Sequence, residues 1–176
     1  MKKLSLTFLL LAAVAMAAVT SPRVSRTSLR AMEKSLDERI SRLWSDVPYL
    51  LIGPTRGVYL DGYGAVFTAE VKLVADRRSL MAPNVSKAEV AQAHQQALDR
   101  IPMLKKALSE ALVSTAASLD TVPAQEQVTI VAFLDHYVWE DQSGMPTQVT
   151  VQAVKGKLLE AQQAGKAASV IQVTEN

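Results

Sequence analysis

A glycine-dense segment is the first place in this chain where residue types and spacing can support binding chemistry. Residues 53–64 hold four glycines together with Arg56, Tyr59, Asp61 and Tyr63. Backbone amides in such a loop can turn toward an anion, Arg56 adds positive charge, and the tyrosines add stacking area and hydroxyls. The simpler explanation of the glycines is tight-turn backbone geometry. If the chain has a ligand surface, we expect it at these four side chains.

The spacing of the glycines argues against a nucleotide-binding motif. It matches neither the dinucleotide-binding fingerprint nor the P-loop, because no predicted helix follows and the P-loop lysine is missing. We therefore predict no nucleotide cofactor.

A second candidate site follows a predicted strand. Asp135, Glu140 and Asp141 can offer oxygen ligands to a cation, and His136 can serve Ser143 as a general base. The segment lacks EF-hand spacing and a nucleophile elbow, and neighbouring residues of a regular strand point to opposite faces. The simpler interpretation is a polar hairpin end with a surface histidine. We keep His136 as a candidate ligand-binding residue and predict no catalytic residue.

Composition excludes several classes of site. The chain has no Cys, which excludes disulfides, thiolate zinc sites, cysteine nucleophiles and a lipid-modified cysteine. The two histidines, His94 and His136, lie far apart in the sequence, and His94 lacks the H-E-x-x-H pairing. We therefore predict no metal site.

The charge balance excludes a nucleic-acid partner once the N-terminus is considered. Loss of Lys2 and Lys3 lowers the basic count from 19 to 17, equal to the 17 acidic residues. A phosphate-backbone binder needs a basic surface, which a neutral chain does not supply.

The N-terminus has the features of an export signal. Lys2 and Lys3 precede an apolar run over residues 4–16, and Ala15-Met16-Ala17 is an A-x-A cleavage site. The sequence therefore predicts a signal peptide over residues 1–17 and a periplasmic or extracellular product. The alternative is an uncleaved inner-membrane anchor over residues 4–22, which is long enough to span a bilayer. Contact with a membrane is expected only in that case.

After the signal, the pattern predicts a flexible leader over residues 18–28 and a single domain over residues 29–176. An amphipathic helix is expected from Leu29 to Val47, with apolar residues three and four apart. Short strands follow, with residues 49–52 and 58–60 forming a hairpin, Asp61-Gly62 forming a turn, and an alternating strand running from Ala65 to Leu73.

The second half begins with the clearest local signal. Ser86-Lys-Ala-Glu89 is a capping box, so a long helix starts at Ser86, and Pro102 kinks or divides it. The apolar run over residues 128–134 predicts a strand in the middle of the sheet. We expect that strand to continue through residue 139, turn at residues 142–146 and return as residues 148–154. A short helix over residues 157–163, closed by Gly165, and a strand over residues 169–174 complete the order.

These elements predict an α+β fold in two layers. A largely antiparallel sheet of about four to six strands would pack against the N-terminal amphipathic helix and the long, Pro-kinked central helix.

One segment resembles a known group of proteins. Gly57 to Phe67 contains the pattern Tyr-x-x-Gly-Tyr-Gly-x-x-Phe, starting at Tyr59. It resembles a group of uncharacterised exported bacterial proteins, which often carry Pro where this chain has Asp61. The segments 127–133 and 146–151 resemble the same group, so the resemblance spans most of the mature chain. It implies export and a common fold, and no activity.

We therefore expect an exported, non-catalytic binding or interaction module of the cell envelope. Its partner would be another envelope protein or a second copy of the chain. The alternative is an extracytoplasmic enzyme or small-ligand receptor that uses residues 53–64 and the hairpin end at residues 136–143.

Overall fold

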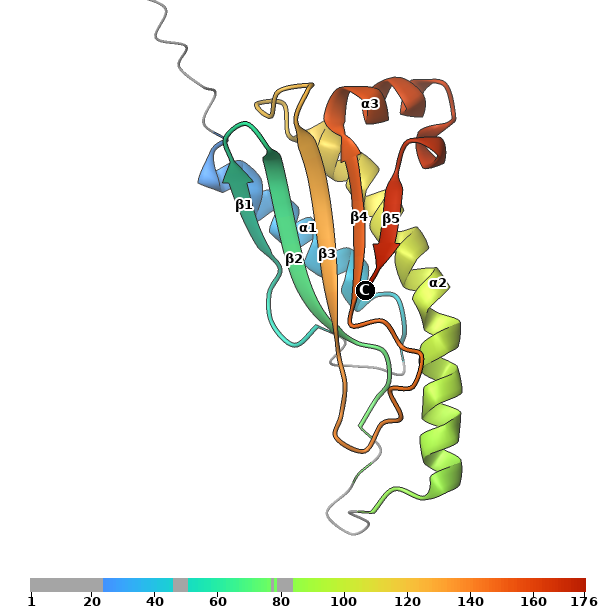
Figure 1. The fold of residues 1–176 in the computed structure, drawn as a ribbon. Coiled ribbons are helices and arrows are strands. Elements are labelled where there is room, and N and C mark those ends of the chain that lie inside the picture. Colours follow the sequence, from blue (N-terminus) through green and yellow to red (C-terminus); the bar gives the residue numbers. More distant parts are fainter. Residues whose placement is uncertain (1–23, 46–50, 77, 79–83) are drawn as a thin grey trace, which may run out of the picture.

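The computed structural model describes residues 24–45, 51–76, 78 and 84–176 (Figure 1). The described residues form an α+β fold with three helices and a five-stranded, mostly antiparallel sheet, which confirms the predicted α+β class and the predicted kind of sheet. The strands lie in the order β1-β2-β3-β4-β5. The elements, in chain order, are α1 (Arg26–Ser41), β1 (Arg56–Leu60), β2 (Gly64–Lys72), α2 (Lys87–Ser118), β3 (Gln127–Asp135), β4 (Gln148–Val154), α3 (Lys155–Gln163), the 3₁₀ turn η1 (Ala167–Ser169) and β5 (Gln172–Glu175).

Helix α1 begins earlier than the sequence pattern indicated. The Ser25 hydroxyl accepts a hydrogen bond from the Ser28 amide at 3.0 Å and caps the first turn, so residues 26–28 are helical and not part of a leader. The buried stripe contains Leu29, Leu36 and Ile40, as the spacing predicted. The helix ends at Ser41, whereas the expected end at Val47 and the predicted signal peptide lie outside the described residues.

The first hairpin differs from the predicted one. Strand β1 pairs with β2 through the Asp61-Gly62 turn, and Gly62 has a φ of 78°. Leu51 forms an isolated bridge with Val71, so it lies on β2 and not against residues 58–60. The expected hairpin over residues 49–60 was therefore wrong, because the alternating strand β2 provides the longer partner for β1. Residues 49 and 50 lie outside the described residues.

Strands β2 and β3 are the one parallel pair among the described strands, and α2 connects them. A parallel pair needs a long crossover, which this helix supplies. Ser86 and Glu89 form the predicted capping box at its start. The helix is continuous through Pro102, so of the two predicted outcomes, a kink or a division into two helices, the division does not occur.

The end of α2 is held by a buried lysine. The Lys155 ammonium donates to the carbonyls of Leu119 at 2.6 Å and Val122 at 2.7 Å. These contacts hold the loop that follows α2 against the start of α3. Burial lowers the pKa of Lys155 below its usual value. Helix α3 starts at this lysine, two residues before the predicted start.

The second half of the sheet follows the predicted order with two changes. Strand β3 occupies the middle of the sheet and forms an antiparallel hairpin with β4, as predicted. It ends at Asp135 and does not continue to residue 139. Gly165 has a φ of 67° and follows α3, as expected for a helix end. The last strand covers Gln172–Glu175, because residues 167–169 form the turn η1.

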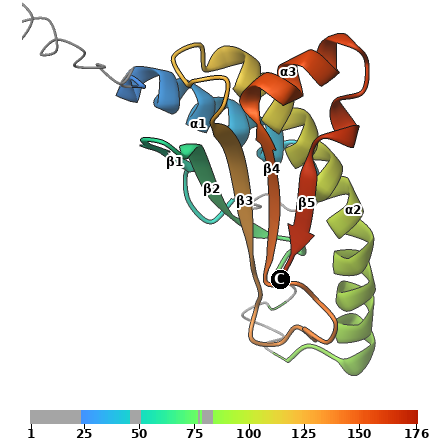
Figure 2. The same cartoon turned by 45° about the horizontal axis from the view of Figure 1, so that its top comes forward.

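The views in Figures 1 and 2 place α1 and α2 on the same side of the sheet. Core side chains on β2 and β3, including Phe67 and Ile130, are fully buried. On the other side of the sheet, Leu60 is 47% exposed and Phe133 is 42% exposed. Among the described residues, no helix is long and apolar enough to cross a membrane.

Candidate functional site

The two tyrosines of the glycine-dense segment contact different partners, Glu126 just before β3 and Thr129 within β3. The Tyr59 hydroxyl donates to Oε1 of Glu126 at 3.2 Å. The Tyr63 hydroxyl lies 3.2 Å from Oγ1 of Thr129, with either atom able to donate. Tyr59 lies opposite Ala65, whose side chain is buried in the core, whereas Tyr63 is 39% exposed. Both hydroxyls therefore connect the β1–β2 hairpin to the chain at the start of β3.

Glu126 is the buried partner at this end of the sheet. Its Oε1 also accepts a hydrogen bond from the Gly62 amide at 3.2 Å, and its Oε2 is buried without a hydrogen-bond partner in the described structure. Desolvation and the hydrogen bond to the Glu126 carboxylate raise the pKa of Tyr59 to about 12, and the charge of Asp61 acts in the same direction. Tyr59 therefore stays neutral and donates over the physiological pH range.

The glycines are explained by close backbone approach. Gly64 has a φ of 130°, and a Cβ atom there would lie 1.9 Å from the Gln127 carbonyl oxygen. A Cβ on Gly57 would lie 2.6 Å from the Phe67 ring. The Gly57 amide instead donates to Glu33 on α1 at 2.8 Å. Tight geometry, the simpler of the two explanations, accounts for these two glycines.

Arg56 is separated from the tyrosines along β1. It pairs with Thr68, whereas Tyr59 pairs with Ala65 three residues further along the hairpin. Arg56 itself lines a small hollow of about 240 Å³ together with Gly53, Glu70 and Phe133. Of the four predicted residues, Tyr59 and Asp61 are close enough to interact, whereas Arg56 lies at the other end of β1 and Tyr63 contacts Thr129.

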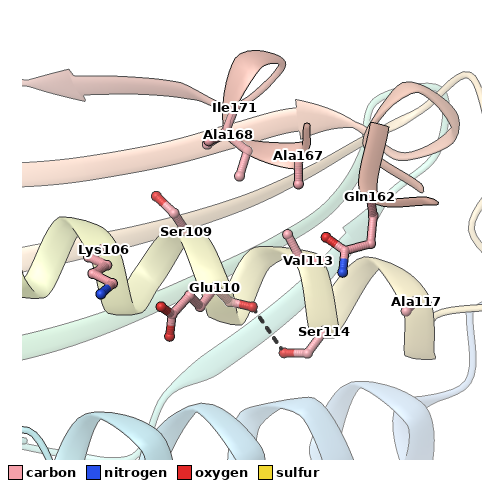
Figure 3. A pocket seen from close by; sticks show the side chains of 10 residues that line it. All are labelled: Lys106, Ser109, Glu110, Val113, Ser114, Ala117, Gln162, Ala167, Ala168 and Ile171. Atoms are coloured by element: carbon pink, nitrogen blue, oxygen red, sulfur yellow. Dashed lines mark hydrogen bonds between the residues drawn. The ribbon is translucent and has the colours of Figure 1, made fainter. Parts of the chain in front are cut away.

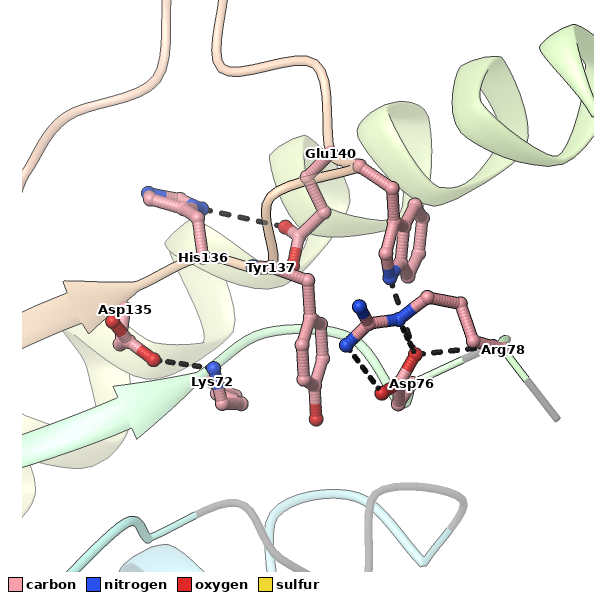
Figure 4. A network of polar contacts seen from close by, with 8 residues as sticks. Lys72, Asp76, Arg78, Asp135, His136, Tyr137 and Glu140 are labelled. Carbon is pink, nitrogen blue, oxygen red and sulfur yellow. Dashed lines mark hydrogen bonds and ion pairs between the residues drawn. The ribbon is translucent and has the colours of Figure 1, made fainter. Parts of the chain in front are cut away.

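The hairpin end that contains His136 is organised by Glu140 (Figure 4). Oε1 of Glu140 accepts a hydrogen bond from the Tyr137 amide at 2.7 Å, and Oε2 lies 3.3 Å from Nδ1 of His136. The side chains of His136 and Glu140 are only 10% and 5% exposed. This carboxylate turns the chain after Asp135, which explains why β3 ends there. His136 is a partly buried residue and not the surface histidine of the simpler interpretation.

Charged and aromatic side chains surround this turn. The Lys72 ammonium pairs with Asp135 and lies 3.9 Å from the centroid of the Tyr137 ring. The Tyr137 ring stacks on Trp139 with a centroid distance of 5.8 Å. Each charge visible in Figure 4 therefore has a structural partner in this network.

Asp76 connects that network to the chain after β2. It accepts two hydrogen bonds from the Arg78 guanidinium, at 2.9 and 3.1 Å, and one from the Trp139 indole at 3.2 Å. The Arg78 hydrogen bond lowers the pKa of Asp76 to about 2. Within the part of the chain that the structure describes, no group of three or more metal-ligating side chains occurs.

The serine and histidine of the hairpin do not form a reactive pair. Nδ1 of His136 is directed to Glu140, whereas the Ser143 amide donates to Asp141 at 2.9 Å. The Asp141 carbonyl in turn lies 2.9 Å from Nδ1 of His94 on α2. These contacts fasten the hairpin to the long helix.

A further cavity lies elsewhere, in a region that carries no residue predicted as a site. An open groove of about 770 Å³ runs along the second half of α2, opposite the segment from α3 to β5 (Figure 3). We call it the α2 groove. It is lined by Lys106, Ser109, Glu110, Val113, Ser114 and Ala117 on α2, and by Gln162, Ala167, Ala168 and Ile171 on the opposite wall.

The α2 groove offers an apolar floor despite its serines. Figure 3 shows Val113 pointing toward Ala167 and Ala168 on the opposite wall. The Ser109 hydroxyl donates to the Lys105 carbonyl at 2.8 Å, and the Ser114 hydroxyl donates to the Ala111 carbonyl at 2.9 Å. Both donors are used within the helix, so the groove presents mainly methyl and methylene groups to an occupant.

One spacing pattern in the sequence is consistent with this groove. Ser109, Val113 and Ala117 recur four residues apart, which places small side chains in one row on the helix surface. A row of small side chains does not identify what lies opposite, so the groove is visible only once the C-terminal segment is placed.

Comparison with models of protein families, with curated proteins and with solved structures finds no match for this chain.

Proposed function

We propose that this chain is an exported, non-catalytic binding module of the bacterial cell envelope, and that its binding site is the α2 groove. The observation that carries this proposal is the groove itself, whose volume of about 770 Å³ lies in the range of small-molecule sites. Export is supported by the charged start, apolar run and Ala15-Met16-Ala17 site of the N-terminal segment. The proposal includes membership of the exported bacterial group that shares the Tyr59 to Phe67 pattern.

The contacts of the polar residues support binding over catalysis. Glu126 holds the β1–β2 hairpin and Glu140 holds the turn after β3, each through a hydrogen bond from a backbone amide. The carboxylate oxygens that accept these hydrogen bonds hold backbone segments in place. The α2 groove, by contrast, has side chains on both walls with space between them.

The proposed architecture has two layers, with α1 and α2 together covering one face of the sheet. Burial of Leu36 and Ile40 on α1 and of Leu104 and Leu108 on α2 supports this arrangement. In it, the groove lies at the outer edge of the helical layer, where α2 meets the C-terminal segment.

The test is binding of a neutral, polarity-sensitive dye such as Nile red to the full chain as its producing cell exports it. We expect saturable binding with increased, blue-shifted fluorescence. Ala117→Trp and Ala168→Trp fill the groove from opposite walls, so each should abolish that binding. Ala88→Trp introduces the same side chain at an exposed position of α2 outside the groove and should leave it unchanged.

Circular dichroism and thermal unfolding must first show that each variant is folded. Absence of saturable dye binding to the unchanged chain would overturn the proposal. Equal loss of binding in Ala88→Trp would also overturn it, because the effect would then not come from the groove.

A further inference from the structure

The dimensions of the α2 groove favour one extended chain as its occupant. Its lining on α2 runs from Lys106 to Ala117, and a helix rises roughly 1.5 Å per residue, which gives a row about 16 Å long. The small side chains Val113, Ala117 and Ala168 leave the space open along that row. This length suits a single acyl chain of medium to long size.

The charges along the groove are unequal at its two ends. Lys106 lies at one end of the row and Ala117 at the other (Figure 3). Lys106 is exposed and makes no ion pair within the described part of the chain, whereas its neighbour Lys105 pairs with Glu175. Gln162, on the opposite wall, carries no charge.

Glu110 is the other charged residue of the lining, and its negative charge bears on the net charge of the groove. Its Oε2 lies 3.6 Å from the Arg39 guanidinium on α1, so a cation from the neighbouring helix offsets its charge. The charge of Glu110 is thus offset, and Lys106 gives one end of the groove a net positive charge. A ligand with a single negative charge beside an apolar chain complements this pattern.

From these observations we propose that the α2 groove binds a fatty carboxylate. Its acyl chain would lie along Val113 and Ala117, and its carboxylate would lie at Lys106. This inference rests on the proposed function, because it names the ligand class of the same groove. A partner helix is less suited, since the opposite wall around Ala167 and Ala168 is a 3₁₀ turn and offers no row of side-chain ridges.

The experiment measures displacement of Nile red from the exported chain by three ligands of equal chain length. These are tetradecanoate, tetradecanol and the tetradecyltrimethylammonium cation, each below the concentration at which it forms micelles. We expect tetradecanoate to bind most tightly and the cation most weakly. Within the carboxylate series from dodecanoate to tetradecanoate, each added methylene should tighten binding about 2- to 4-fold.

Lys106→Gln separates the role of the headgroup from that of the chain. It should weaken tetradecanoate about 2- to 5-fold, as expected for an exposed ion pair, and leave tetradecanol unchanged. Lys87→Gln removes another exposed lysine of α2, outside the groove, and should change neither ligand.

The outcomes distinguish this inference from the proposed function. If Nile red binds but all three headgroups compete equally, or if Lys106→Gln has no effect, the fatty carboxylate is wrong and the groove remains a binding site. If Nile red does not bind at all, the proposed function fails. A dimer in light scattering that Ala117→Trp dissociates would assign the groove to a second copy and overturn the inference.

Discussion

The Tyr59 hydroxyl and the Glu126 carboxylate form a 3.2 Å hydrogen bond between residues 67 positions apart in the chain. This bond joins the β1–β2 hairpin to the residue that precedes β3. The same carboxylate oxygen accepts the Gly62 amide, so one acidic side chain fixes both the end of the strand and its turn. Residues that resembled a ligand-binding segment therefore act on the stability of the sheet.

Tyr59 makes stability fall at alkaline pH. Its pKa rises from a usual value of 10.0 to about 12 in the folded chain, so the folded state holds the phenolic proton more tightly than the unfolded state. The contribution is present below pH 10 and is lost as pH rises toward 12. One pKa unit corresponds to about 1.4 kcal/mol, and solvent screening at this half-buried position reduces the expected effect to about 1 kcal/mol.

Urea unfolding at a series of pH values tests this dependence. Tyr59→Phe should lower the free energy of unfolding by about 1 kcal/mol at neutral pH and flatten the decline above pH 10. An unchanged alkaline decline in Tyr59→Phe would assign the effect to another tyrosine.

Replacement of Glu126 by Gln should destabilise the fold less than replacement by Ala. Gln at this position keeps one oxygen to accept from Tyr59 and Gly62 and removes a buried charge, so we expect Glu126→Gln to cost under about 1 kcal/mol. Glu126→Ala leaves both donors without their acceptor and should cost about 2 to 3 kcal/mol. Urea unfolding of the two variants measures the difference, and equal costs would show that the hydrogen bonds do not carry the effect.

Gly64 should not accept any side chain. Its φ of 130° and the 1.9 Å approach of a Cβ to the Gln127 carbonyl predict that Gly64→Ala costs 3 kcal/mol or more, on the order of the largest single-site effects. Gly53 has open space around its Cβ position, so Gly53→Ala is the matched control and should change stability by less than about 0.5 kcal/mol. Thermal unfolding that ranks the two variants equally would contradict the close approach.

Local patterns in the sequence predicted the individual helices and strands better than they predicted which strands pair. Alternation identified β2, and the capping box located the start of α2 at Ser86, because both depend on residues within one or two turns of the chain. The Asp61-Gly62 turn was likewise visible. The partner of residues 58–60 was predicted wrongly, since the choice between residues 49–52 and β2 depends on which of them offers the longer ladder.

The arrangement of the candidate sites depends on contacts that local sequence patterns do not contain. The end of β3 at Asp135 depends on Glu140 accepting the Tyr137 amide, and strand propensity does not include that contact. The α2 groove depends on how residues 162–171 pack beside a helix some fifty positions earlier in the chain. The groove is formed by tertiary packing, so the sequence indicates it only through the small side chains on α2.

Two substitutions outside the α2 groove distinguish it from the sites that the sequence favoured. Tyr63→Ala removes a hydroxyl that contacts Thr129, and His136→Ala removes the partner of Glu140, so each should lower the free energy of unfolding by about 1 kcal/mol. Neither residue lines the groove, so both variants should bind Nile red with unchanged affinity in a fluorescence titration. Loss of dye binding in a folded Tyr63→Ala or His136→Ala variant would return the binding site to the glycine-dense segment or to the hairpin end.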